Sequence, residues 1–248
     1  MRGLNICIPS YNRPQGLKGK DYFSAAKYVI PESQRDQYTK TVGAKRLIVI
    51  PDESDRNIAR KRNWILRNIE RPLLMLDDDV SALGHSEGGK QQICLDPETA
   101  LDVIKQGFNL AYEWGCVFWG VNCNEDGRNY QQYKPFSLTS VVLGPFQGHL
   151  EHNLLYDERM GTKDDYDFSL QVLCRYKRLL RFNKYCYFTD HGDNAGGIVS
   201  ERTMAKEQTY CEAIQRKWGT QVIKYRLPPQ KMWDLLNAQK VNVPIAGV

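Results

Sequence analysis

The sequence has few of the features that indicate zinc sites, disulfides or membranes. Its 248 residues include four histidines and seven cysteines, and no two cysteines form a Cys-x-x-Cys pair. We interpret the cysteines as reduced core thiols, and not as zinc ligands or a disulfide framework. No apolar run reaches membrane-spanning length and no stretch resembles a signal peptide. We therefore predict a cytoplasmic protein with no membrane partner.

Internal repeats and low-complexity linkers are also missing, so nothing suggests dividing the chain into two domains. Hydrophobic residues make up 42% and charged residues 25%, which is ordinary for a globular protein. The formal charge of +5 is compatible with a polyanionic partner without requiring one. We predict one domain over residues 1–199, with a nucleotide half (about 1–82) and an acceptor half (about 93–199). A C-terminal helix and basic tail (200–248) would pack on the same domain.

Strand-like and helix-like segments alternate in the first third of the chain. This alternation predicts βαβ units, and therefore an α/β fold with a mostly parallel sheet flanked by helices. Ser54 is the expected N-cap of the second helix. The predicted strands are 4–8, 46–50 and 72–76, and the predicted helices are 21–30 and 55–69.

Clearer boundaries mark the next helix, where Asp96 is a capping residue, Pro97 takes the first helical position and Gly115 ends the segment. Thr162 opens another helix, and acidic residues follow it from Asp164 onward. Beyond 96–115, the predicted helices are 162–180 and 200–218, and the predicted strands are 116–121, 137–143 and 185–188.

Asp77, Asp78 and Asp79 follow a buried strand directly. Ligands of open α/β sheets bind beyond the carboxyl ends of the strands, and adjacent carboxylates repel one another unless cations or solvent hold them. Hard cations such as Mg²⁺ and Mn²⁺ prefer oxygen ligands. A divalent cation with a nucleoside diphosphate is the simplest explanation. The alternative is an acidic turn that caps a following helix.

The helix before this strand carries several cations. Arg56, Arg60 and Asn63 recur at i, i+4 and i+7, so they share a face that could bind a diphosphate or a base. The remaining basic residues are expected on the solvated side, and these are Lys61, Arg67 and Arg71.

Two further groups have the chemistry of a site. Asp164, Asp165 and Asp167 stand at a helix start, where a surplus carboxylate could be a general base. Thr162 with Asp165 could instead be a capping box.

His191 follows the predicted strand 185–188 and lies between Asp190 and Asp193, so it is a possible metal ligand. The alternative is an ordinary loop histidine.

Four motifs, taken in order, resemble those of GT-A glycosyltransferases over roughly the first 200 residues. In such enzymes the opening loop holds the nucleotide base, a DxD-like motif binds ribose and metal, and a later acidic motif supplies the acceptor base. The motifs are Ile8-Pro9-Ser10-Tyr11-Asn12-Arg13, Ala59-Arg60-Lys61-Arg62-Asn63, Leu76-Asp77-Asp78-Asp79 and Asp164-Asp165-Tyr166-Asp167.

The resemblance implies a GT-A, Rossmann-like fold, a UDP-sugar donor and a Mn²⁺ or Mg²⁺ cofactor. Asp79 and His191 would bind the metal, and Asp77 would contact ribose or metal. Asp165 would be the base, with Asp164 standing where many relatives carry Glu. The nucleotide-sugar would contact Pro9, Ser10, Tyr11, Asn12, Arg13, Arg56, Arg60, Asn63, Asp77 and Asp78, the last with no particular role assigned.

A narrower resemblance is to phage TET-associated glycosyltransferases, which are thought to attach sugars to 5-hydroxymethylcytosine in DNA. It implies DNA as the acceptor, in the cytoplasm of a host cell. A loop with Tyr130 and Tyr133 could stack on a base. The hydroxymethyl group could be reached from the major groove or after base flipping, and the sequence does not choose. The short sequence segments on which this resemblance rests are Lys20-Asp21-Tyr22, Tyr28-Val29-Ile30-Pro31-Glu32-Ser33-Gln34 and Gln37-Tyr38.

The expected reaction is therefore transfer of a sugar from UDP to hydroxymethylcytosine, with inversion, after Asp165 takes the proton of the acceptor hydroxyl. One alternative is a GT-A enzyme that acts on a glycan or a protein. Another is a non-catalytic module that binds a nucleotide or DNA, in which the acids are only caps and turns. Donor sugar and oligomeric state are not indicated by the sequence.

Overall fold

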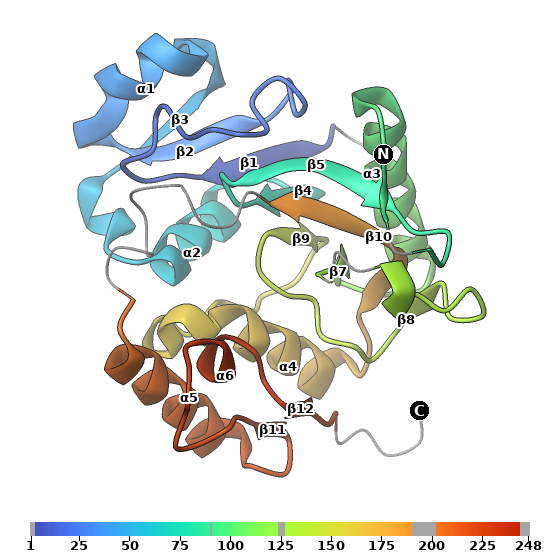
Figure 1. Ribbon diagram of the computed structural model, residues 1–248. Coiled ribbons are helices and arrows are strands. Elements are labelled where there is room, and N and C mark those ends of the chain that lie inside the picture. Colours follow the sequence, from blue (N-terminus) through green and yellow to red (C-terminus); the bar gives the residue numbers. More distant parts are fainter. Residues whose placement is uncertain (1–2, 90, 124–126, 190–201, 244–248) are drawn as a thin grey trace.

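A ten-stranded sheet forms the centre of the computed structural model, which describes residues 3–89, 91–123, 127–189 and 202–243 (Figure 1). The predicted metal ligand His191 lies outside these residues. The strands are β1 (Asn5–Pro9), β2 (Lys27–Pro31), β3 (Leu47–Ile50), β4 (Leu73–Leu76), β5 (Val80–His85), β6 (Ile93–Cys94), β7 (Phe118–Asn122), β8 (Phe136–Ser137), β9 (Phe146–His149) and β10 (Leu180–Thr189).

The sheet order is β3-β2-β1-β4-β9-β7-β10-β5-β6, and β8 pairs with β10. Parallel pairs join β1 to β2 and β4, β2 to β3, and β7 to β10. Strands β5, β8 and β9 pair with their neighbours in the opposite direction, so the other seven of the ten strands all run one way. This confirms the predicted α/β class with a mostly parallel sheet.

Helices cover both faces of the sheet. The first face packs against α3, whose Ile104 and Phe108 are buried in one core cluster with Trp119 of β7. The opposite face packs against α2 and α4, which contribute Ile65 and Phe168 to a second cluster (Figure 1). The helices are α1 (Arg35–Val42), α2 (Ile58–Asn68), α3 (Pro97–Glu113), α4 (Asp164–Tyr176), α5 (Met204–Trp218) and α6 (Trp233–Leu236).

A third cluster lies around the C-terminal part of the described chain. Cys211 of α5 and Leu235 of α6 pack with Met160 and Tyr166, next to the start of α4. A small sheet of β11 (Ile223–Lys224) and β12 (Lys240–Val241) completes this region. The division of the chain into domains stays a prediction. Among the described residues no helix is both long and apolar enough to span a membrane.

Helix ends with strong local signals were predicted correctly. Asp96 caps α3, since its Oδ1 accepts hydrogen bonds from the amides of Glu98 and Thr99, both at 3.0 Å. Gly115 follows the end of this helix at φ +63°, a conformation that favours glycine. The predicted cap Ser54 is wrong, because α2 begins at Ile58 and the side chain of Asn57 accepts the amide of Arg60 at 2.8 Å.

Two other assignments are wrong, and one helix was missed. The predicted helix 21–30 is a turn followed by β2, because residues 28–30 form a continuous apolar run buried between β1 and β3. The short helix α1 was missed, since its only buried residue is Tyr38. The predicted strand 137–143 shortens to β8, because the chain leaves the sheet and returns as β9, which lies antiparallel between β4 and β7.

Candidate active site

The candidate site begins at the carboxyl end of β4, where the chain leaves the sheet. Residues 73–76 are fully buried between β1 and β9, and the amide of Asp77 then donates to the carbonyl oxygen of Pro145 at 3.1 Å. Strand β1 pairs in parallel with β4, with Cys7 opposite Met75. This register brings Ser10, directly after β1, to the level of Asp78. The two loops therefore meet at the carboxyl edge of the sheet, as expected for a ligand site.

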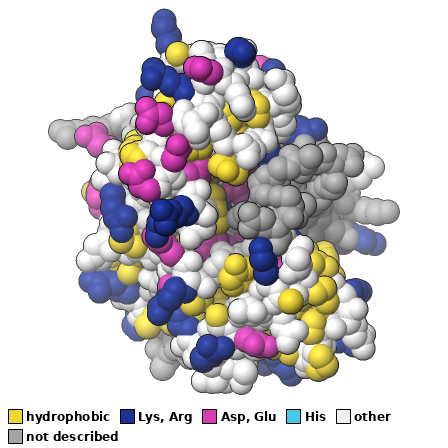
Figure 2. Space-filling view, turned by 90° about the vertical axis from the view of Figure 1, so that its left-hand side faces the viewer, with side chains coloured by type: hydrophobic (Ala, Val, Ile, Leu, Met, Phe, Trp, Pro, Cys, Tyr) yellow, Lys and Arg dark blue, Asp and Glu magenta, His cyan; other side chains and the backbone are white. Residues whose placement is uncertain are grey.

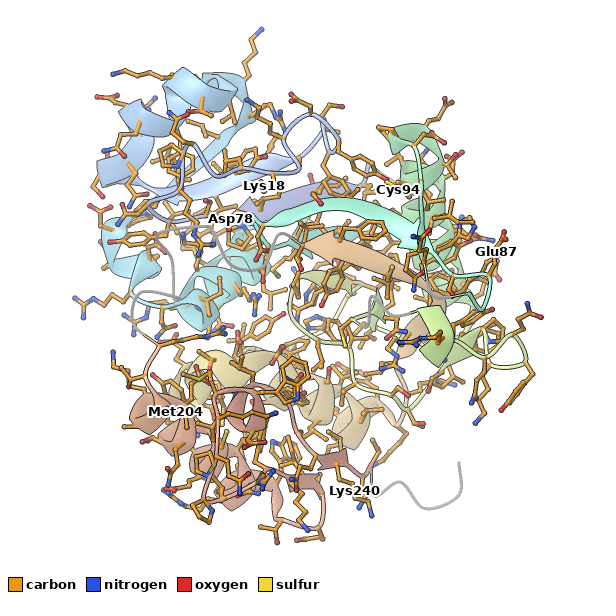
Figure 3. The ribbon with its side chains drawn as sticks, in the orientation of Figure 1. Lys18, Asp78, Glu87, Cys94, Met204 and Lys240 are labelled. Atoms are coloured by element: carbon orange, nitrogen blue, oxygen red, sulfur yellow. The ribbon has the colours of Figure 1, made fainter. Side chains whose placement is uncertain are left out.

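Asp78 joins these two loops. Its carboxylate accepts the hydroxyl of Ser10 at 2.5 Å and pairs with the guanidinium of Arg13 at 3.1 Å. Its carbonyl oxygen accepts the amide of Lys18 at 3.4 Å, and Figure 3 shows the two labelled residues next to each other. Burial raises the pKa of Asp78, and the bonds from Ser10 and Arg13 oppose that rise. The acid without an assigned role thus holds the loop from Ser10 to Lys18 against the end of β4.

Asp79 lies next to it with an unsatisfied oxygen. Among the described residues, Oδ1 of this side chain is buried and has no hydrogen-bond partner. Burial, together with the neighbouring charges of Asp77 and Asp78, raises the pKa of Asp79 to about 7. A buried carboxylate oxygen without a donor fits a divalent cation as its partner. In the described ranges no three His, Cys, Asp or Glu side chains converge as a complete ligand set.

Arg62 connects the acids after β4 with those that begin α4. Its NH2 lies 2.9 Å from Oδ1 of Asp77 and its NH1 lies 2.8 Å from Oδ2 of Asp164, while its side chain is only 4% exposed. The guanidinium also packs over the ring of Tyr156, 5.5 Å from the centroid. Burial raises the pKa of Asp164 to about 6, although Arg62 opposes this. The sequence assigned no role to Arg62.

Lys61 is a second basic residue whose environment was predicted wrongly. It was expected on the solvated side, but it is 2% exposed because this side of α2 faces the end of β1. Its ammonium contacts Asp55 Oδ1 at 2.7 Å and the carbonyl oxygen of Ser10 at 2.6 Å. Burial lowers the pKa of Lys61, and Asp55 opposes this. Arg67 is exposed as predicted, and Arg71 is only half-buried.

The predicted nucleotide-binding face of α2 contacts a different segment. Arg60 pairs with Glu158 at 2.8 Å. Asn63 donates to the carbonyl oxygen of Tyr156 at 2.9 Å and accepts its amide at 2.8 Å. Arg56 is exposed. Arg60 and Asn63 do share a face, but the structure does not bring them to the acids after β4, and their role with the nucleotide-sugar stays a prediction.

The loop after Pro9, the buried last residue of β1, is held in a defined conformation. Asn12 adopts φ +53° and exchanges two hydrogen bonds with Gln34, at 2.8 and 2.7 Å. The hydroxyl of Tyr38 contacts Ser10 Oγ at 2.7 Å and accepts the amide of Arg13 at 3.0 Å. Tyr11 is 46% exposed, and the ammonium of Lys61 lies 5.8 Å from its ring centroid. An exposed aromatic ring is therefore presented beside the acids.

Asp165 is oriented by two backbone amides. Its Oδ1 accepts from Tyr166 at 2.7 Å and its Oδ2 accepts from Gly144 at 2.8 Å. Burial raises the pKa of Asp165, and Arg62 and the two amides oppose the rise. The capping-box alternative is wrong, because α4 begins without a side-chain cap and the hydroxyl of Thr162 donates to Glu207 instead, at 2.8 Å.

Asp167, the third acid of this motif, is fully buried and serves to join two helices. It pairs with the ammonium of Lys217 at 2.8 Å and accepts the indole N–H of Trp218 at 2.7 Å. A hollow is visible on the face of the molecule that Figure 2 draws. Figure 2 shows acidic side chains in and beside this hollow, with Lys and Arg side chains around it.

Fold and site together define an α/β protein of the Rossmann-like class with acids at the carboxyl edge of its sheet. Residues 8–197 match the family described as TET-Associated Glycosyltransferase (TAGT). The chain therefore belongs to the TET-associated glycosyltransferases, and the predicted enzyme class is confirmed. No curated protein matches the sequence. Among similar solved structures is a CMP:2-keto-3-deoxy-manno-octonic acid synthetase complexed with CTP, with 8% identity and a TM-score of 0.33 over 86% of this chain and 99% of that one.

Proposed function

We propose that this glycosyltransferase moves a sugar from a UDP-sugar to the hydroxyl of 5-hydroxymethylcytosine in DNA, with the help of Mn²⁺ or Mg²⁺. Membership of the family supports sugar transfer. The main support for a metal ion bound with the diphosphate comes from Asp79. Its buried Oδ1 has no hydrogen-bond partner among the described residues. DNA as the substrate implies action in the cytoplasm of a host cell, if a bacteriophage encodes the chain.

On the donor side, the chain's own residues would hold the nucleotide. Asp78, Ser10 and Arg13 fix the loop after β1, so that the exposed ring of Tyr11 is available to stack on the uracil. Arg62 orients the carboxylate of Asp77, the proposed contact to the ribose or, with Asp79 and His191, to the cation. A divalent cation held there would neutralise charge on the diphosphate leaving group, a contribution of several kcal/mol.

On the acceptor side, Asp165 would take the proton of the hydroxymethyl group as its oxygen attacks the anomeric carbon and the bond to UDP breaks. The amides of Tyr166 and Gly144 fix the carboxylate and leave further lone pairs for the acceptor hydroxyl. The raised pKa of Asp165 makes it a stronger base than an exposed carboxylate. Asp164, bound by Arg62, would act as a positioning residue.

The test compares three DNA duplexes of one sequence that carry cytosine, 5-methylcytosine or 5-hydroxymethylcytosine. Each is incubated with Mn²⁺ and a panel of UDP-sugars, and its nucleosides are measured by mass spectrometry. The proposal expects one hexose mass on the hydroxymethylated DNA alone. Transfer only to glycan or protein acceptors would instead support the alternative acceptor class. No UDP binding in the presence of Mn²⁺ would contradict the donor assignment.

A further inference from the structure

A cavity of about 500 Å³ lies on the α4 side of the sheet, outside the set of predicted site residues. It lies between the segment before β9, the first part of β10 and the chain around β12, whose Lys240 is labelled in Figure 3. Its size falls in the range of small-ligand pockets, about 300–1,000 Å³. The residues that line it are Thr139, Ser140, Val141, Arg181, Val241, Asn242 and Val243.

Arg181 brings a positive charge to this cavity. Its Nε donates to Oδ1 of Asn183 at 3.0 Å and its NH1 to the carbonyl oxygen of Val141 at 3.4 Å. Within the part of the chain that the structure describes, no carboxylate pairs with it. Burial lowers the pKa of Arg181, so its charge is desolvated without an anion to compensate it. A partly buried guanidinium of this kind is stabilised when an anion binds to it.

The polar neighbours of Arg181 are hydrogen-bond donors. The backbone amides of Thr139 and Ser140 donate to Oγ of Ser137, at 3.3 and 3.0 Å. The hydroxyls of Thr139 and Ser140 make no hydrogen bond within the described ranges and can donate to a ligand. Three valines form the apolar part of the lining. The cavity therefore offers one cation, two hydroxyls and an apolar wall, a combination that suits a phosphate with part of its nucleotide.

One short segment connects this cavity with the proposed base. Its first residue, Val141, accepts the hydrogen bond from Arg181, and its last, Gly144, donates to Oδ2 of Asp165. Three residue steps span at most about 10 Å even when fully extended. The cavity thus lies close to the carboxylate that would receive the acceptor proton, within the reach of one extended nucleotide.

We propose that this cavity binds a phosphodiester group of the acceptor DNA strand, next to the nucleotide that receives the sugar. The inference rests on the proposed function, because it takes DNA as the acceptor. The planar guanidinium of Arg181 would bind two phosphate oxygens, and the hydroxyls of Thr139 and Ser140 would bind the remaining oxygens. Arg181 would then determine that a nucleic acid strand, and not a free nucleoside, is the preferred acceptor.

The test uses the full chain with Arg181→Gln, Arg181→Lys and, as a matched control, Arg35→Gln on the exposed surface of α1. The acceptors are 5-hydroxymethyl-2'-deoxycytidine, which has no phosphate, and a single-stranded oligonucleotide with one hydroxymethylcytosine. Arg181→Gln should raise the KM for the oligonucleotide about tenfold or more and leave the nucleoside reaction unchanged. It should also reduce the slope of log kcat/KM against log salt by about 0.7, as for one lost phosphate contact.

Arg181→Lys should keep the salt slope and lose part of the affinity, and Arg35→Gln should match the parent chain. An unchanged KM and salt slope in Arg181→Gln would overturn the inference while leaving the proposed function standing. Equal losses with nucleoside and oligonucleotide would also overturn it, because they indicate a structural role. If Arg181→Gln does not fold, Thr139→Val with Ser140→Ala replaces it and should raise the oligonucleotide KM alone; no rise would overturn the inference.

Binding of DNA without a donor tests the phosphate site even if the proposed sugar transfer fails. If the parent chain transfers sugar to no hydroxymethylated acceptor, binding of a fluorescent oligonucleotide without donor is measured by anisotropy. Weaker binding by Arg181→Gln than by the parent and Arg35→Gln would support the phosphate site. Equal or absent binding in all three chains would overturn it.

Discussion

Replacing Arg62 with Gln removes the positive charge that the partly exposed Asp77 and the buried Asp164 share, and we expect a large loss of stability. Its two charge-assisted hydrogen bonds, at 2.9 Å to Asp77 and 2.8 Å to Asp164, lie in a region where the arginine is 4% exposed. Removing one partner of a buried ion pair costs about 3–5 kcal/mol. For a chain of this length, that corresponds to a fall in Tm of roughly 6–20 °C.

The loss should depend on pH. Burial raises the pKa of Asp164 to about 6 in the folded chain, above the ordinary value of 3.8. An acid with a raised folded pKa destabilises the fold when ionised, so the penalty is present above about pH 6 and disappears as pH falls toward 4. Without Arg62 the pKa of Asp164 should rise further. Arg62→Gln should therefore lose more stability at pH 8 than at pH 5, where Asp164 can take up a proton.

Thermal unfolding followed by circular dichroism at both pH values checks this, with Arg67→Gln as the control. Arg67 is an exposed arginine on the same helix, and its substitution should change stability by no more than about 0.5 kcal/mol. The proposed role of Arg62 is refuted if Arg62→Gln and Arg67→Gln have the same Tm at pH 8. It is also refuted if Arg62→Gln loses as much Tm at pH 5 as at pH 8.

Three further variants probe the proposed chemistry. Asp165→Asn should lower transfer by about 10²–10⁴-fold, with UDP binding by calorimetry unchanged, and a loss of both would indicate a structural role. Asp79→Ala should abolish the Mn²⁺-dependent part of UDP binding, and full transfer activity in this variant would disprove the metal assignment. Tyr11→Ala should weaken UDP binding about tenfold through lost stacking, whereas unchanged affinity would remove Tyr11 from the nucleotide site.

Local chemistry explains what could be predicted from the sequence. The position of the acids after β4 could be predicted from a buried apolar run followed by charged residues. The start of α3 could be predicted from Asp96 and the proline after it. The prediction of a helix at 21–30 failed because apolar residues of a buried turn, Tyr22, Phe23 and Ala26, followed by a short buried strand give an accidental helical spacing. Strand β9 was missed because four residues that contain a glycine carry little periodicity.

The roles of Arg62 and Lys61 depend on tertiary structure. Both stand in a run of basic residues that, taken alone, is indistinguishable from a solvated helix face. Their burial arises because α2 packs this side against the ends of β1 and β4, where Asp55, Asp77 and Asp164 are available as partners. Asp164 lies 102 positions from Arg62 in the chain, so no local pattern could indicate the pair.

The contacts between α4 and α5 bear on where the functional unit of this protein ends. The family match stops at residue 197, yet the helix that carries Asp165 is neutralised from beyond that point. Glu207 pairs with the buried ammonium of Lys163 at 2.9 Å, and Lys217 pairs with Asp167 at 2.8 Å. A chain that stopped at the family boundary would leave Lys163 and Asp167, on either side of the proposed base, without their ion-pair partners. The segment beyond the matched residues therefore helps to position the helix that carries Asp165, and we expect substitutions in that segment to affect this helix without altering any family motif.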